Sequence, residues 1–67
     1  YIDAINSLGE VYIMALNDNT NAIEQFERTV KIKPDFASGW YNLGYTYFTM
    51  QDYEKALPNF KQSAFLI

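Results

Sequence analysis

The sequence predicts an all-α fold in which two antiparallel helix-turn-helix hairpins stack side by side. Two observations lead to this prediction. Ala22 and Ala56 lie 34 residues apart, and so do Phe26 and Phe60, so the sequence contains two copies of one pattern. Between short turn-forming segments, apolar residues also recur at helical spacing. A period of this size indicates stacked supersecondary units rather than one globular core.

The first hairpin is expected to hold helices over residues 2–16 and 20–32. Segment 17–21, Asn-Asp-Asn-Thr-Asn, forms the turn and supplies an N-cap, because its side chains compete for backbone hydrogen bonds. The first helix repeats Ile5, Leu8 and Tyr12 at helical spacing. The expected buried stripe of the second helix is Ala22, Ile23, Phe26 and Val30.

The second hairpin is expected to hold helices over residues 36–50 and 53–66. Pro34 ends the preceding helix, Asp35 can cap the next one, and Asp52 can cap the last. Pro58 lies within the last helix and predicts a small bend or a late start. The inward residues of that helix are expected to be Ala56, Leu57, Phe60 and Ala64.

Gly9 and Gly44 fall inside predicted helices, where each costs about 1 kcal/mol relative to alanine. This cost predicts that the paired helices approach most closely there, with the small residues Ala22 and Ala56 opposite. Short connections make successive helices antiparallel neighbours.

The motif Trp40-x-x-Leu43-Gly44-x-x-Tyr47, followed by Ala56-x-x-x-Phe60, resembles the tetratricopeptide repeat. The first copy keeps Leu8-Gly9, Tyr12, Ala22, Phe26 and Pro34, but has Ile5 in place of tryptophan, while Thr29 and Ser63 replace the usual alanine. The resemblance implies a right-handed α-solenoid in a single domain, 1–67, with repeats 2–34 and 35–67. The second repeat is expected to end without a capping helix.

The composition disfavours catalysis. The chain has no cysteine and no histidine, so its serines lack the commonest activating base. Its glycines are isolated and form no phosphate loop, and the turn at Asp18, Asn19 and Asn21 lacks the glycine and distal glutamate of a calcium loop. We therefore expect no enzyme activity, no cofactor and no metal.

The charge and hydropathy patterns limit the classes of partner that the chain is expected to bind. A net charge of −3 without clustered Lys and Arg disfavours nucleic acid. No apolar run approaches the length of a membrane span, so no membrane partner is expected. Composition leaves the compartment open.

In the resembled family the first helix of each hairpin lines the concave side of a superhelix. The candidate binding residues are then Asn6, Glu10, Ile13, Tyr41, Asn42, Tyr45 and Phe48. Tyr41, Tyr45 and Phe48 form one stripe at helical spacing. This stripe is either an aromatic platform for a peptide or packing against the neighbouring hairpin, and the sequence leaves both open.

The distribution of charged residues indicates which charge the ligand is expected to have. All five basic residues lie on the second and fourth predicted helices or at their ends. Some members of the family hold acidic tails of heat-shock chaperones with lysine, arginine and asparagine. Here Asn42 matches one such asparagine, but Asn6 stands where a basic residue is needed, and Glu10 would repel a carboxylate. A neutral to basic peptide is expected instead.

We therefore predict a protein–protein interaction module that binds a peptide or partner segment through its concave face. The alternative is a structural unit that oligomerises through exposed repeat faces, because the chain ends on the apolar segment Ala64-Phe65-Leu66-Ile67. A piece cut from a longer array and a minimal two-repeat unit also explain that ending, and we expect the former.

Overall fold

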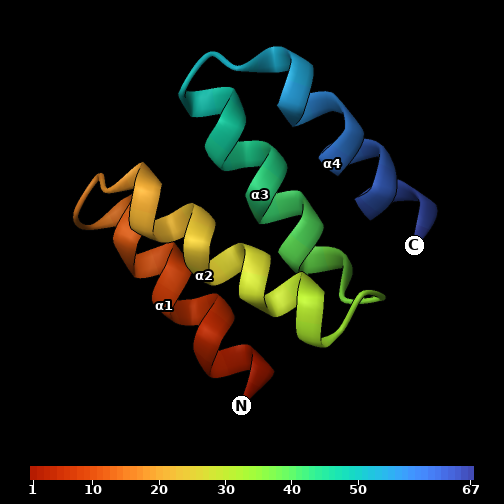
Figure 1. Cartoon of the computed structure of the whole chain (residues 1–67), viewed down its shortest axis with the longest axis horizontal. Helices are drawn as coiled ribbons and strands as arrows, with labels where there is room; N and C mark the ends of the chain where they lie inside the picture. The colour runs from red at the N-terminus through yellow and green to blue at the C-terminus, as the bar shows by residue number, and fades with distance from the viewer.

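The computed structural model describes all residues, 1–67, and consists of four helices. These are α1 (Ile2–Met14), α2 (Asn19–Ile32), α3 (Ala37–Thr49) and α4 (Tyr53–Phe65) (Figure 1). They confirm the predicted all-α helical-hairpin repeat, and each boundary lies within two residues of its expected position. None of the four combines the length and the apolar character that crossing a bilayer requires.

The helices pack in chain order. The pairs α1–α2 and α3–α4 form the two hairpins, α2 packs against α3, and α1 also contacts α3 (Figure 1). Helices α1 and α4 lie at opposite ends of the stack. The Cα atoms fill a slab of 30 × 29 × 15 Å.

One hydrophobic core serves both hairpins and is centred on α2. Ala22, Phe26 and Val30 of α2 are buried together with Leu43 of α3. Thr29 is also fully buried, and its hydroxyl donates to the carbonyl of Gln25 at 3.0 Å. The two hairpins are therefore joined by apolar packing and not only by their connecting loop.

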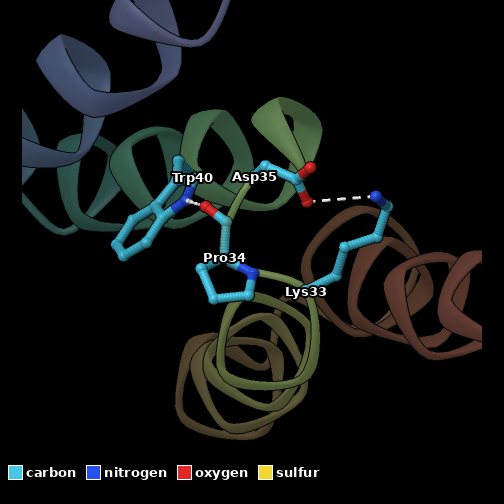
Figure 2. A network of polar contacts seen from close by, with 4 residues as sticks. All are labelled: Lys33, Pro34, Asp35 and Trp40. Carbon is cyan, nitrogen blue, oxygen red and sulfur yellow. Dashed lines mark hydrogen bonds and ion pairs between the residues drawn. The ribbon is translucent and has the colours of Figure 1, made fainter.

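Two aspartates cap helices, but the expected third does not. The carboxylate of Asp18 accepts from the backbone N–H of Asn21, and that of Asp52 from the N–H of Lys55. At the start of α3 the N-cap is Phe36, which makes no side-chain bond, so the prediction for Asp35 was wrong. Its carboxylate instead accepts from the Lys33 ammonium at 3.0 Å (Figure 2), and this hydrogen bond and charge lower the pKa of Asp35.

The link between the hairpins is also tied by Trp40. The indole N–H of Trp40 donates to the carbonyl of Pro34 at 2.7 Å (Figure 2), while the ring packs against the core. A second polar contact joins α4 to the start of α3: the hydroxyl of Ser63 donates to the carbonyl of Ala37 at 3.0 Å.

Gly9 and Gly44 lie where paired helices approach closely, as predicted. A Cβ at Gly9 would lie 2.5 Å from the ring of Phe26, and one at Gly44 would lie 2.8 Å from the ring of Phe60. The nearest atoms thus belong to phenylalanine rings rather than to Ala22 and Ala56, which corrects the expected pairing of small residues. Each glycine makes room for one aromatic ring.

Two residues at expected inward positions, Leu57 and Ala64, are exposed. Leu8, which the sequence placed only at helical spacing, is exposed as well. Helix α4 packs only against α3, so just one of its faces is covered, and Leu8 lies on a face of α1 that no helix covers. Helix α4 also begins at Tyr53 with Pro58 inside it, so no late start occurs.

Candidate functional site

A groove runs along the two first helices, α1 and α3, and is made of three adjoining hollows. Their volumes are about 400, 220 and 330 Å³. The first and second share Glu10, Tyr41 and Asn42, and the second and third share Ile13, Met14 and Tyr45. We call this surface the α1–α3 groove; its lining residues are Asn6, Glu10, Ile13, Met14, Asn17, Ala37, Ser38, Tyr41, Asn42, Tyr45, Thr49, Ser63 and Ile67.

A polar network crosses the groove between the hairpins. The Asn42 amide donates to the Oδ1 atom of Asn6 at 3.1 Å and to the Oε2 atom of Glu10 at 3.2 Å. The Asn6 amide donates to the same Oε2 atom at 3.4 Å. Asn6 is buried, while Glu10 and Asn42 are half-buried. The Glu10 carboxylate is thus oriented by one amide from each hairpin.

Two tyrosines present their rings to the groove. Tyr41 is 53% exposed and Tyr45 is 43% exposed. The ring of Tyr41 is supported by Phe60 of α4, with centroids 5.6 Å apart. Ile13 lies nearby and serves two roles, because it packs against the core and also lines two of the hollows.

The structure brings six of the seven predicted residues into this groove and leaves out Phe48. The Phe48 ring lies 5.4 Å from that of Tyr53 and lines a separate apolar hollow of about 300 Å³ on the α3–α4 side. The stripe of Tyr41, Tyr45 and Phe48 is therefore divided between two surfaces. Helical spacing aligned the three residues but did not show where α4 would cover the stripe.

Sequence reasoning missed several lining residues, of which Ser38 and Met14 are the most informative. Ser38 precedes Asn42 by four residues and Met14 follows Glu10 by four, so both share a helix face with a predicted residue. That spacing was the available signal. Ser63 and Ile67 come from α4 and the chain end, and only the tertiary packing brings them to the groove.

The groove contains a negative charge without a protein counter-charge. Helices α1 and α3 contain no lysine or arginine. The two ion pairs, Lys33–Asp35 and Lys55–Asp52, both lie outside the groove. The one tyrosine with a shifted pKa is also elsewhere: burial, then the charges of Glu27 and Asp52, raise the pKa of Tyr47, which packs against the core.

This arrangement offers an oriented carboxylate, amide groups and aromatic faces along one open surface. Such groups hold a ligand by hydrogen bonding and stacking. They supply what an extended chain segment needs for recognition, namely polar partners for its backbone and apolar surface for its side chains.

Comparison with known families agrees with the fold. A family model described as "TPR repeat" matches residues 13–51, which is more than half of the chain, and a model described as "Tetratricopeptide repeat" matches residues 37–66. A search of curated proteins gave no match. The repeat limits 2–34 and 35–67 stay a prediction. Repeats of this kind generally mediate protein–protein interaction and are typically non-catalytic. With four helices in two hairpins and two overlapping matches, the chain belongs to the tetratricopeptide repeat family.

Proposed function

We propose that this chain binds an extended segment of a partner protein along the α1–α3 groove, without chemistry of its own. The observation that supports the proposal most directly is the continuity of the groove. Three hollows adjoin along both first helices, and two half-exposed tyrosines project into them. In our proposal, Asn6, Glu10, Ile13, Tyr41, Asn42 and Tyr45 contact the ligand, and Phe48 does not.

The physical basis is preorganisation. The Asn6, Glu10 and Asn42 side chains are already held by hydrogen bonds, and Tyr41 is supported by Phe60, so little side-chain freedom is lost on binding. Tyrosines add large contact areas at low entropic cost and are enriched among the residues that dominate binding energy. The uncompensated carboxylate disfavours an acidic segment and supports a neutral to basic one.

The test is a random octapeptide library selected on the wild-type chain, followed by affinity measurement with the selected peptides. We expect Tyr45→Ala to weaken binding about tenfold or more, as truncation of an interfacial aromatic does, with an unchanged helical circular dichroism spectrum. Tyr53→Ala is the matched control, because Tyr53 is similarly exposed but lies outside the groove. Parallel losses of binding and of thermal stability in Tyr45→Ala would show that Tyr45 acts as core.

A second candidate function is self-assembly through the ends of the stack. The first observation in its favour is the apolar hollow on the α3–α4 side, lined by Phe48, Tyr53, Ala56, Leu57 and Phe60. The second is Phe65, the last residue of α4, which is 83% exposed. At the other end, α1 exposes Leu8 and Val11. Exposed apolar surface of this kind favours association, and a molecular mass that rises with concentration would support this function.

A further inference from the structure

The Glu10 carboxylate has unused bonding capacity directed to solvent. Both amide bonds that it accepts end on Oε2. Its Oε1 atom has no hydrogen-bond partner in the protein, yet it is not among the buried unsatisfied atoms, so it reaches solvent. A carboxylate can accept about four hydrogen bonds. The two asparagines therefore fix its orientation and leave one oxygen free for a donor from outside.

The surroundings of this oxygen favour a cationic donor. Among the elements that pack on α1, helix α3 has no charged residue, and neither basic residue of α2 pairs with Glu10. The Arg28 guanidinium donates to Gln25, and Lys31 forms no ion pair. The other acidic residue of α1, Asp3, adds negative charge to the same helix. No basic side chain of the protein thus pairs with Glu10, and a cation from a ligand can take that place.

The hollow next to Glu10 has the form of a site for a basic side chain. It has a volume of about 220 Å³ and is lined by Glu10, Ile13, Met14, Tyr41, Asn42 and Tyr45. Tyrosine ring faces attract cations, and arginine most often, because its planar guanidinium stacks on the ring. Ile13 and Met14 supply an apolar wall suited to the methylene stem of such a side chain.

We infer that this hollow binds one basic side chain of the partner segment, arginine in preference to lysine, with its cationic head on Glu10 and beside Tyr41 and Tyr45. The inference rests on the proposed binding of a segment in the groove and adds the chemistry of one ligand position. The larger hollow, which shares Glu10, Tyr41 and Asn42 and includes Ser38, continues the groove for the neighbouring ligand residues.

The experiment uses the octapeptides selected from the random library on the wild-type chain. We expect one peptide position to be enriched in arginine. Replacing that arginine by citrulline, which keeps its shape and removes its charge, should weaken binding about tenfold. The substitution Glu10→Gln should weaken binding of the arginine peptide by a similar factor and leave the affinity for the citrulline peptide almost unchanged. Raising the salt concentration should reduce the difference in affinity between the arginine peptide and the citrulline peptide, because salt screens the charge interaction with Glu10.

The matched control is Glu24→Gln, which makes the same change of charge on an exposed site of α2 outside the groove. It should bind both peptides as the wild type does. Peptides that bind the groove with no preference for a basic residue, or an arginine preference that survives in Glu10→Gln, would overturn this inference and leave the proposed function standing. If no peptide binds, both this inference and the proposed function fail.

Discussion

Leu8 and Leu43 occupy the same position in the two copies of the repeat, directly before Gly9 and Gly44. Their surroundings differ sharply: Leu43 is 3% exposed within the shared core, whereas Leu8 is 43% exposed. Leu43 packs against α2 of the preceding hairpin. Within the described residues no hairpin precedes α1, so no corresponding helix covers Leu8. The role of a repeat residue therefore depends on whether a neighbouring hairpin covers it.

This pair of leucines gives a prediction at the residue scale. Leu43→Ala should lower the free energy of unfolding by about 2–5 kcal/mol, because it leaves a cavity in the core. Leu8→Ala should cost about 0.5 kcal/mol, as is usual for an exposed position. Urea denaturation of both variants provides the measurement. Equal losses would mean that the first hairpin is packed differently from the structure described above.

At the scale of the element, α4 contains an internal conflict. Its N-terminus is capped by Asp52, but Pro58 lies in the interior of this 13-residue helix. A proline there has no N–H to donate to the carbonyl of Glu54 and crowds the preceding turn. The helix persists nevertheless, because Ala56 and Phe60 pack on α3 and Ser63 bonds to Ala37.

We therefore expect Pro58→Ala to stabilise the chain by about 1–3 kcal/mol, since the restored bond outweighs the added freedom of the unfolded chain. Thermal unfolding followed by circular dichroism should show a rise of several degrees. Lys61→Ala, an exposed change in the same helix, is the control and should leave the midpoint almost unchanged. A drop in the midpoint of Pro58→Ala would show that the proline is favourable where it stands.

The elements themselves were largely predictable from the sequence because their signals are local. Asp18 and Asp52 lie at turns and cap the following helices, and the apolar spacing located all four helices. Asp35 was mispredicted because α3 begins at Ala37, one residue later than expected. Phe36 is therefore the N-cap, and the Asp35 carboxylate pairs with Lys33 instead. Leu57 and Ala64 were mispredicted because helical spacing indicates an apolar face but not which faces are covered.

The candidate site was predictable as a set of residues but not as a geometry. Asn6, Glu10 and Asn42 were expected on one surface. The convergence of two amides on one oxygen of Glu10 depends on how far α1 is shifted along α3, and the sequence contains no signal for that shift. Likewise, only the position of α4 decides that Phe48 packs on Tyr53 while Tyr45 remains in the groove.

At the scale of the whole molecule, the two ends of the stack are different surfaces. Helix α1 exposes Leu8 and Val11, and α4 exposes Leu57 and Phe65. Unlike surfaces that pair between copies make a head-to-tail contact, which continues from copy to copy instead of closing. Self-assembly of this chain, if it is a function, should therefore produce growing chains of copies rather than a fixed dimer.

Sedimentation equilibrium over a wide concentration range tests this prediction. The wild type should show a mass that increases steadily with concentration, while Leu8→Glu and Phe65→Glu should each block one end. Each variant alone should be a monomer, and an equimolar mixture should form a dimer, because one intact end of each kind remains. A wild type that stays monomeric throughout would exclude self-assembly, and a Leu8→Glu variant that still dimerises would point to a symmetric contact through α4.

The bond from the Trp40 indole to the carbonyl of Pro34 has a practical consequence (Figure 2). Trp40 is the single tryptophan of the chain, so its fluorescence reports on the junction between the hairpins, whereas circular dichroism reports on all four helices together. Superimposable melting curves from the two signals mean that the hairpins unfold as one cooperative unit. An earlier change in fluorescence means that the junction opens while the helices persist, and the chain then contains its own optical probe of separation between repeats.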